Sequence, residues 1–313
     1  MMGVFCVITA ICLNPSFDRT VEVDSLQMGE VNRIRSARTD MGGKGLNVAV
    51  VARRLGLQSQ CIGVMGTDGA DRYSAMMDQE GVRHDFLRIP GSIRTNTKIV
   101  SGDGKGVTEL NESGCAISPE QLEAFFDLAR SHAAESRYSV LTGSLPPGCP
   151  AGTYRDLMKA MEGTNCILDA EGREMMLGAE AHPFLIKPNL QELQTTLGLE
   201  LRTLRSIRDA ALIFLRKGVQ HVVVSMGSMG ALYACKEHTL FAPALRVEAS
   251  STVGAGDAMI GGLLKGLEVE GDMARAFRYG VAAGAASVMT EGTQLIVPEV
   301  FSSLLSQVKV QEV

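Results

Sequence analysis

One aspartate in this 313-residue chain follows closely spaced glycines at a predicted helix start, where it could act as a base. The segment Gly254-Ala255-Gly256-Asp257 comes after a predicted strand and loop, Val247–Thr252, and opens a predicted helix, Ala258–Leu267. Backbone N–H groups at a glycine-lined helix start can bind an anion. A carboxylate there would repel a bound phosphate unless it takes a proton from the group that attacks it. The alternative is an acidic residue that only complements the helix dipole.

A second glycine-rich segment, Gly42-Gly43-Lys44-Gly45, precedes the predicted helix Leu46–Leu55. It indicates either another helix start, at which Lys44 and Asn47 face a polar ligand, or a flexible turn with a solvated lysine. Two common nucleotide motifs are absent. The G-x-G-x-x-G fingerprint would need a third glycine where Met259 stands, and no Gly-Lys pair is followed by Ser or Thr, as a P-loop requires.

Polar residues also follow the predicted first strand, Val4–Leu13. Asn14 and Asp18 come where a parallel sheet places its ligand crevice, although an Asn-Pro pair alone is more typical of a plain turn.

Two later segments have both a structural and a functional interpretation. In Lys187-Pro188-Asn189-x-x-Glu192, the last two residues fit a capping box, and they also present oxygens suited to a hydrated Mg²⁺. The segment from Ser225 to Gly230 fits either a hairpin turn or a loop around a nucleotide phosphate.

The composition excludes several classes of protein. Hydrophobic residues make up 45% and charged residues 21%, which predicts a folded core. A net charge of −5 argues against nucleic-acid or membrane partners but permits a small anionic substrate. The seven cysteines are scattered without a CxxC pair, which favours a reducing, cytoplasmic location over a disulfide framework or zinc ribbon. No apolar run reaches the ~20 residues of a membrane span.

From Tyr138 onward, short continuous apolar runs alternate with helical patterns. This alternation predicts βαβ units and a parallel sheet covered on both faces. The predicted strands are Tyr138–Thr142, Cys166–Asp169, Phe184–Pro188 and His221–Ser225. The predicted helices are Ala151–Met161, Leu190–Leu197, Leu204–Lys217 and Met273–Met289, with a further helix start at Ser118-Pro119-Glu120-Gln121.

The N-terminal third carries polar residues within its strand-like segments, as exposed strands do. These segments are Thr20–Val23, Val31–Thr39, Thr97–Ser101 and Val107–Leu110. We predict one α/β domain over residues 1–313, with a small β-sheet lid drawn from about 18–40 and 94–111. An open sheet face must be covered, so we expect two lids to pair in a homodimer.

Together and in this order, the segments resemble the PfkB (ribokinase-like) carbohydrate kinase family over nearly the whole chain. The resemblance rests on Gly42-Gly43-Lys44-Gly45-x-Asn47, Lys187-Pro188-Asn189-x-x-Glu192, Ser225-x-Gly227-x-x-Gly230 and Thr252-Val253-Gly254-Ala255-Gly256-Asp257. Three further segments, Leu13–Asp18, Thr108–Asn111 and Gly143–Gly148, resemble its phosphosugar branch. The resemblance implies a three-layer α/β/α domain with a central, mostly parallel sheet.

The resemblance also implies a role for each matched residue. Asp257 would be the general base, and the amides of Gly254, Ala255 and Gly256 would form the anion hole. The sugar phosphate would be bound by Asn14, Asp18, Gly42, Gly43, Lys44, Asn47, Arg94, Lys98, Asn111 and Ser144. ATP would be bound by Lys187, Asn189, Ser225, Gly227, Gly230 and Thr252. Magnesium would be held by Glu192 through water, with Asp169 as a further candidate ligand.

Several substrates stay open within this resemblance. Arg94–Lys98 and Thr108–Asn111 favour fructose 1-phosphate as substrate, whereas Gly292-Thr293-Gln294-Leu295 is closer to 6-phosphofructokinase, and tagatose 6-phosphate is a further alternative. A nucleoside or simple-sugar kinase would have no use for Arg94 and Lys98. A non-catalytic sugar-phosphate sensor would gain nothing from Asp257.

Overall fold

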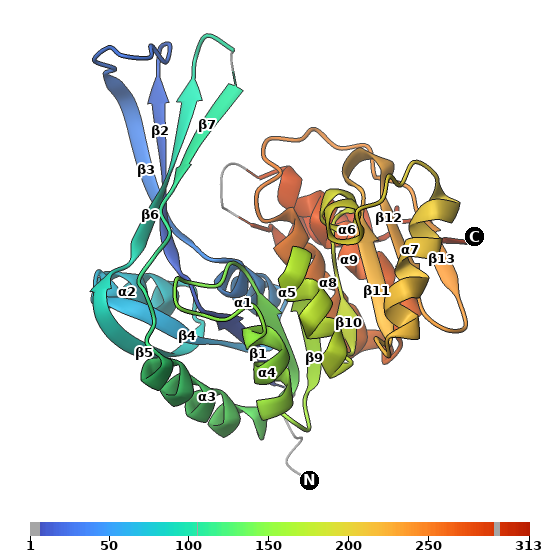
Figure 1. Cartoon of the computed structure of the whole chain (residues 1–313). Coiled ribbons are helices and arrows are strands. Elements are labelled where there is room, and N and C mark those ends of the chain that lie inside the picture. Colours follow the sequence, from blue (N-terminus) through green and yellow to red (C-terminus); the bar gives the residue numbers. More distant parts are fainter. Residues whose placement is uncertain (1–6, 105, 291–294) are drawn as a thin grey trace.

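A computed structural model of the chain describes residues 7–104, 106–290 and 295–313. Residues 4–6 of the predicted first strand, and residues 292–294 of the segment that is closer to 6-phosphofructokinase, lie outside the described residues. Figure 1 shows a broad α/β body from which a small sheet projects. Among the described helices, none is both long and apolar enough to cross a membrane.

The body is built on a ten-stranded sheet in the order β14-β13-β12-β11-β10-β9-β8-β1-β4-β5. The strands from β11 to β5 in this order are parallel, and β12, β13 and β14 extend the sheet antiparallel. Their bounds are β1 Val7–Cys12, β4 Gln58–Asp68, β5 Arg83–Ser92, β8 Ser136–Thr142, β9 Asn165–Asp169, β10 Leu185–Ile186, β11 His221–Ser225, β12 Ala231–Ala234, β13 Thr239–Ala242 and β14 Gln311–Glu312. This confirms the predicted fold class.

Helices cover both faces of this sheet and bury one hydrophobic core on each side. The first face carries α1 Lys44–Arg54, α2 Ala70–Gln79, α8 Ala255–Glu270, α9 Met273–Val288 and α10 Pro298–Leu305. The second face carries α3 Pro119–Ala133, α4 Thr153–Ala160, α5 Gly172–Gly178, α6 Leu190–Leu197 and α7 Leu204–Arg216. Because successive side chains of a strand point to opposite faces, β1 contributes Ile8 to the first core and Ile11 to the second.

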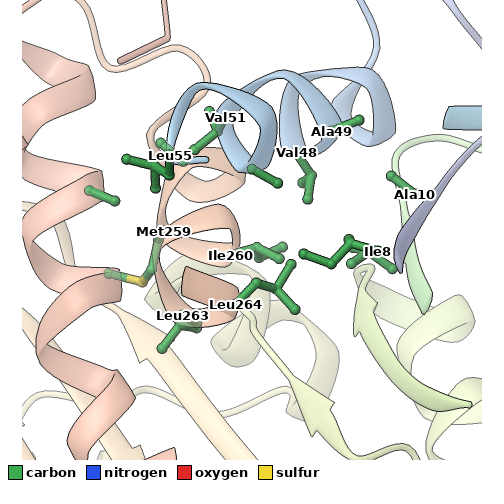
Figure 2. Packing of buried hydrophobic residues seen from close by; sticks show 14 of the residues in the cluster. Ile8, Ala10, Val48, Ala49, Val51, Leu55, Met259, Ile260, Leu263 and Leu264 are labelled. Carbon is green, nitrogen blue, oxygen red and sulfur yellow. The ribbon is translucent and has the colours of Figure 1, made fainter. Parts of the chain in front are cut away.

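The first core fixes α1 against α8, the two helices that begin at the predicted glycine-rich segments. In Figure 2, Val48 of α1 and Ile260 and Leu264 of α8 gather around one space together with Ile8 of β1, and Val51 of α1 lies beside Leu55. The two helix starts are therefore positioned by a shared, close-packed core.

The small sheet has four strands in the order β3-β2-β6-β7. Their bounds are β2 Ser16–Val23, β3 Ile34–Gly42, β6 Arg94–Ser101 and β7 Gly106–Asn111. β2 pairs with β6 in parallel and with β3 antiparallel, while β7 is antiparallel to β6. All four predicted exposed strands lie in this sheet. β3 starts at Ile34 rather than Val31, because Asn32 closes a turn through hydrogen bonds to the backbone of Gln27 and Glu30.

Two of the elements, β11 and α6, have the bounds that the sequence predicts. The prediction of a strand within Val247–Thr252 is wrong. The N–H groups of Ser250 and Ser251 donate to the carbonyl oxygen of Val288 at the end of α9 instead of to a neighbouring strand. The sequence patterns also missed β4, in which Gly63 and Gly66 interrupt the apolar run.

Candidate active site

The carboxyl edge of the parallel sheet gathers most of the residues singled out in the sequence. Asn14 and Ser144 follow β1 and β8, Asp169 ends β9, Lys187 follows β10, and Ser225 ends β11. These strands are neighbours in the sheet. In open α/β sheets, ligands bind in the crevice at this edge, beside the strand at which the chain order reverses. β1 is that strand here, since it lies between β8 and β4.

The two glycine-rich helix starts meet at this edge. Gly254 has a left-handed φ of 79° that turns the chain into α8 and places Asp257 in the first turn of the helix. Asn47, in the first turns of α1, donates a hydrogen bond of 2.8 Å from Nδ2 to Oδ2 of Asp257. Two motifs that lie 210 residues apart in sequence are thus joined by one buried contact.

Burial changes the acid–base properties of Asp257, which is only 4% exposed. Burial, and after it the negative charge of Asp169, raises the pKa of Asp257 from its ordinary value to about 7. Lys44 and Lys187 act in the opposite direction, as does the hydrogen bond from Asn47. A carboxylate with a pKa near 7 is partly ionised at neutral pH and can still take up a proton.

A buried ion pair lies beside Asp257. Lys187 and Asp169 are each 3% exposed, and Lys187 Nζ lies 3.1 Å from Asp169 Oδ1. The Thr142 hydroxyl donates to the other oxygen, Oδ2, at 2.9 Å. Although burial alone would raise the pKa of Asp169, the cations Lys187 and Lys44 and the hydrogen bonds hold it below its usual range.

The Lys187 ammonium group also reaches the start of α8. A Cβ atom at Gly256 would lie 3.1 Å from Lys187 Nζ, so glycine at this position leaves the ammonium group room beside the loop. This places a fixed positive charge next to the amides of the glycine-rich loop.

Lys44 lies between the acidic groups of the site. Its Nζ is 4.0 Å from Asp169 Oδ2 and 4.0 Å from Glu192 Oε1. These charges, Asp169 first, raise the pKa of Lys44, so its ammonium group stays charged at neutral pH. Lys44 therefore lies near the predicted metal ligands as well as beside Gly43, and its predicted sugar contact stays a prediction.

The two predicted magnesium ligands, Glu192 and Asp169, differ in whether a carboxylate oxygen is available for a metal ion. Within the described ranges, no group of three or more His, Cys, Asp or Glu side chains could hold a metal ion. Glu192 forms the predicted capping box with Asn189 through Oε2, so that Oε1 has, in the described part of the chain, only the long contact to Lys44. Both Asp169 oxygens already have protein partners. A hydrated ion bound mainly by nucleotide phosphates needs only one or two carboxylates, and Glu192 fits that requirement better than Asp169.

Residues predicted for the sugar phosphate line a pocket of about 410 Å³ that includes Asn14, Arg94 and Ser144. Asn14 Nδ2 donates to Ser144 Oγ at 3.2 Å and to the Ser113 carbonyl oxygen at 3.0 Å. The Arg94 guanidinium group donates to the carbonyl oxygens of Asn14 and Glu112.

The small sheet brings Asp18 and Lys98 to the same face as Arg94, since these residues alternate along β2 and β6. Gly42 ends β3 opposite Ser16, where a Cβ atom would lie only 2.4 Å from both Ser16 Oγ and Asp18 Oδ1. Asn111 is exposed at the end of β7, opposite Asn96 of β6.

The remaining predicted nucleotide ligands lie at the far end of the edge. Ser225 forms an isolated parallel bridge with Asn189. Gly227 and Gly230 have positive φ angles in the 3₁₀ turn that joins β11 to β12, which supplies the predicted hairpin without testing the nucleotide role. Thr252 precedes the Gly254 turn and is exposed.

The sequence analysis did not single out three residues that support these groups: Ser16, Asn96 and Thr142. Asn96 was recognisable, because it alternates with Arg94 and Lys98 on one strand face. Thr142 was not, because its contact with Asp169 depends on the pairing of β8 with β9.

Comparison with known proteins assigns the chain to a family. A family profile described as pfkB family carbohydrate kinase matches residues 10–300. The chain belongs to the pfkB family. It is 32% identical to a 1-phosphofructokinase of Vibrio cholerae over 305 residues, which covers 97% of this chain and 96% of that protein. It is also 32% identical to a 1-phosphofructokinase of Bacillus subtilis over 306 residues, 97% and 99% of the two chains.

Solved structures of related kinases share the fold. Phosphofructokinase-2 from Escherichia coli, in complex with substrates and products, aligns with a TM-score of 0.88 at 26% identity, over 96% of this chain and 99% of that one. A ribokinase from Thermotoga maritima aligns with a TM-score of 0.81 at 23% identity, over 96% and 100% of the two chains, which shows the fold alone. As a pfkB carbohydrate kinase, the protein is a phosphotransferase with a hydroxyl group as acceptor, which confirms the predicted enzyme class.

We predict that the variant Asp169→Asn lowers the free energy of unfolding by about 3–5 kcal/mol, because it leaves the Lys187 ammonium group buried without a counter-charge. The double variant Asp169→Asn/Lys187→Met should lose less than the sum of the two single changes. Urea unfolding of all three variants measures this coupling. Asp127→Asn, which breaks an exposed ion pair with Arg130, is the control and should change stability by less than about 1 kcal/mol. Additive losses would contradict the coupling.

Proposed function

We propose that this pfkB kinase transfers the γ-phosphoryl group of ATP to fructose 1-phosphate and forms fructose 1,6-bisphosphate and ADP, with residues 1–313 acting as one catalytic domain. The observation that carries the proposal is the pair of cations Arg94 and Lys98 on the site-facing side of β6. Neither forms an ion pair with a carboxylate in the described part of the chain. Relatives named 1-phosphofructokinase support the same substrate.

These cations fit a phosphorylated substrate for a physical reason. A guanidinium group binds phosphate through parallel N–H donors, and among the described residues the Arg94 donors reach only neutral carbonyl oxygens. Because Arg94 lines the same pocket as Asn14 and Ser144, a phosphate bound by Arg94 would hold the sugar against the carboxyl edge of the sheet.

We assign proton transfer to Asp257. Its carboxylate would accept the proton of the sugar hydroxyl as the hydroxyl oxygen forms its bond to the γ-phosphorus and the bond to the bridging oxygen of ADP breaks. Asn47 holds the carboxylate in place through Oδ2. The amides of Gly254, Ala255 and Gly256 would stabilise charge on the transferred group, with Lys187 as the adjacent fixed cation.

We assign the nucleotide to the half of the edge that carries Asn189, Ser225 and the turn containing Gly227 and Gly230, with Thr252 at its rim. Magnesium bound with ATP would neutralise phosphate charge, and Glu192 would hold it through water. Lys44, which lies between Glu192 and Asp169, would position the phosphate chain from the opposite side.

We infer that the small sheet acts as a lid over the sugar site and as the contact between two copies of the chain. Its face opposite Asp18 carries Ile34 and Leu110, which are 50% and 57% exposed. Exposed apolar side chains on a sheet with two open edges need a partner. A related phosphofructokinase-2 is described as tetrameric, which supports self-association in the family.

We predict a much higher kcat/KM for fructose 1-phosphate than for fructose, and a loss of about 10- to 150-fold in the variant Arg94→Ala, since a charge-assisted hydrogen bond contributes about 1.5–3 kcal/mol. A coupled assay of ADP release over fructose, fructose 1-phosphate, fructose 6-phosphate, tagatose 6-phosphate and adenosine measures this preference.

The control for this assay is Arg88→Ala, which removes an exposed arginine from β5 and should leave kcat/KM unchanged. Equal efficiency on fructose and fructose 1-phosphate would overturn the phosphosugar assignment. No phosphorylation of any acceptor would favour a sugar-phosphate sensor.

We predict that Asp257→Asn keeps the fold but lowers kcat by about 10²- to 10⁴-fold, as loss of a general base does. In the wild type, kcat/KM should fall as the pH drops through about 7, because protonated Asp257 cannot accept a proton. The pH dependence of sugar-phosphate binding, measured separately by calorimetry, corrects for ionisation of the substrate.

The matched control for Asp257 is Asp71, an exposed aspartate in the first turn of α2. Asp71→Asn removes a first-turn carboxylate together with its exposed ion pair to Arg88, and it should leave kcat unchanged. A kcat of Asp257→Asn within about threefold of wild type would show that Asp257 has no larger role than Asp71.

We predict a dimer by light scattering, and a shift to monomer in the variant Leu110→Asp, because a buried carboxylate would be placed in the apolar contact. Val269→Asp, which alters an exposed valine of α8, should leave the mass unchanged. A wild-type monomer at all concentrations would refute the lid contact.

A further inference from the structure

The strand β6 carries three chemically different side chains on one face. Arg94, Asn96 and Lys98 alternate along the strand, so they point to the same side. In the parallel register with β2, Asn96 lies beside Asp18, between the two cations. On the β6 side, Asp18 therefore has a neutral amide as its direct neighbour and a positive charge on either side, each two residues along the strand. On the β3 side its direct neighbour is Asp40, whose carboxylate is paired with Arg38.

The carboxylate of Asp18 is held through one of its oxygens. Oδ1 accepts hydrogen bonds from Ser16 Oγ at 2.9 Å and from Asn96 Nδ2 at 3.1 Å. Asn96 Nδ2 also lies 3.2 Å from Ser16 Oγ, which closes a triangle of three side chains. Asp18 is 9% exposed and Ser16 1%. The other oxygen, Oδ2, forms no hydrogen bond within the described residues.

The Asn96 amide is oriented with its nitrogen toward Asp18 and its oxygen away from any hydrogen-bond donor in the described residues. Its oxygen, Oδ1, is buried and has no hydrogen-bond partner among the described residues. An unpaired buried acceptor costs stability. The reverse orientation would turn this oxygen toward the Asp18 carboxylate and remove both donated bonds. The amide thus keeps Nδ2 on Asp18 at the expense of its own oxygen.

Asp18 forms no ion pair, and neither do Arg94 and Lys98, across the residues that the structure describes. This is unusual for a nearly buried carboxylate flanked by cations, because opposite charges at such spacing attract. The Asn96 amide donates its hydrogen bond to Oδ1 of Asp18, the oxygen that faces β6. A cation of β6 would otherwise bind at this oxygen.

We infer that Asn96, assisted by Ser16, is a positioning residue for the sugar-phosphate substrate. It fixes the Asp18 carboxylate so that Oδ2 accepts a sugar hydroxyl, and it keeps Asp18 from neutralising Arg94 and Lys98, which then remain available for the phosphate. The inference rests on the proposed function, since it assumes a substrate that carries both hydroxyl groups and a phosphate.

The test compares Asn96→Ala with Thr97→Ala, the next residue of β6, whose side chain points to the opposite face. The substrates are fructose 1-phosphate and its 3-deoxy and 4-deoxy analogues. Asp18→Ala identifies which missing hydroxyl Asp18 recognises, because that variant no longer distinguishes that analogue from the full substrate.

For Asn96→Ala we expect KM for fructose 1-phosphate to rise about tenfold with kcat within about threefold and KM for ATP unchanged. The preference for the intact sugar over the identified analogue should also fall by about tenfold, as when a site loses a positioned hydroxyl partner. Thr97→Ala should behave like the wild type in every measurement. Ser16→Ala should give the same pattern with a smaller effect, and it carries the test if Asn96→Ala does not fold.

If Asn96→Ala discriminates between the intact sugar and its analogue as well as the wild type does, the inference is overturned. It is also overturned if KM rises equally for fructose 1-phosphate and ATP, because that result indicates a general disruption of the structure. If the wild type phosphorylates none of these sugars, the proposed function fails instead. Calorimetric binding of fructose 1-phosphate to the same variants then tests Asn96 on its own, and equal affinity in wild type and Asn96→Ala would overturn its role.

Discussion

The burial of charge at the carboxyl edge of the sheet is the constraint on which the rest of the site depends. Asp169, Lys187 and Asp257 are each less than 5% exposed. Two carboxylates and one ammonium group that are shielded from solvent can coexist only if the distances between them are fixed. Lys187 and Thr142 hold Asp169 ionised, and the negative charge that results helps to keep the pKa of Asp257 near 7. The ion pair thus connects stability of the fold with the acid–base chemistry of the site.

Under the proposed function, the main sheet and the small sheet have different roles. Strand ends and two helix starts of the main body would hold the charges that act on the phosphoryl group. The small sheet would carry the residues that distinguish one acceptor from another, Asp18 and Asn96 with the cations Arg94 and Lys98. Because these two sets come from different sheets, the acceptor preference can change through the small sheet without disturbing the buried charges. This separation fits a family in which one fold serves many sugars.

The sequence predicted the layers of the fold better than the contacts of the site. Continuous apolar runs such as His221–Ser225 identify strands because both faces of the sheet are covered. β4 was not predicted because Gly63 interrupts its run of apolar residues. This glycine is required by the packing of β4 on β1, since a Cβ atom there would lie 1.9 Å from the Cys12 carbonyl oxygen. The motifs around Asn47 and Asp257 were both recognisable. Their hydrogen bond was not, because only the packing of α1 on α8 brings them together.

The parallel pairing of β2 with β6 has a consequence for how the molecule reaches its native state. Asp18 and Asn96 lie 78 residues apart in sequence, and α1, β4, α2 and β5 intervene. Closing so long a loop costs chain entropy before any strand contact compensates for it. The small sheet should therefore assemble only after the intervening part of the main sheet has formed. A partly folded chain would have the intervening α1, β4, α2 and β5 in place before Asp18 meets Asn96. Under the proposed function, acceptor binding would therefore report on a late step of folding.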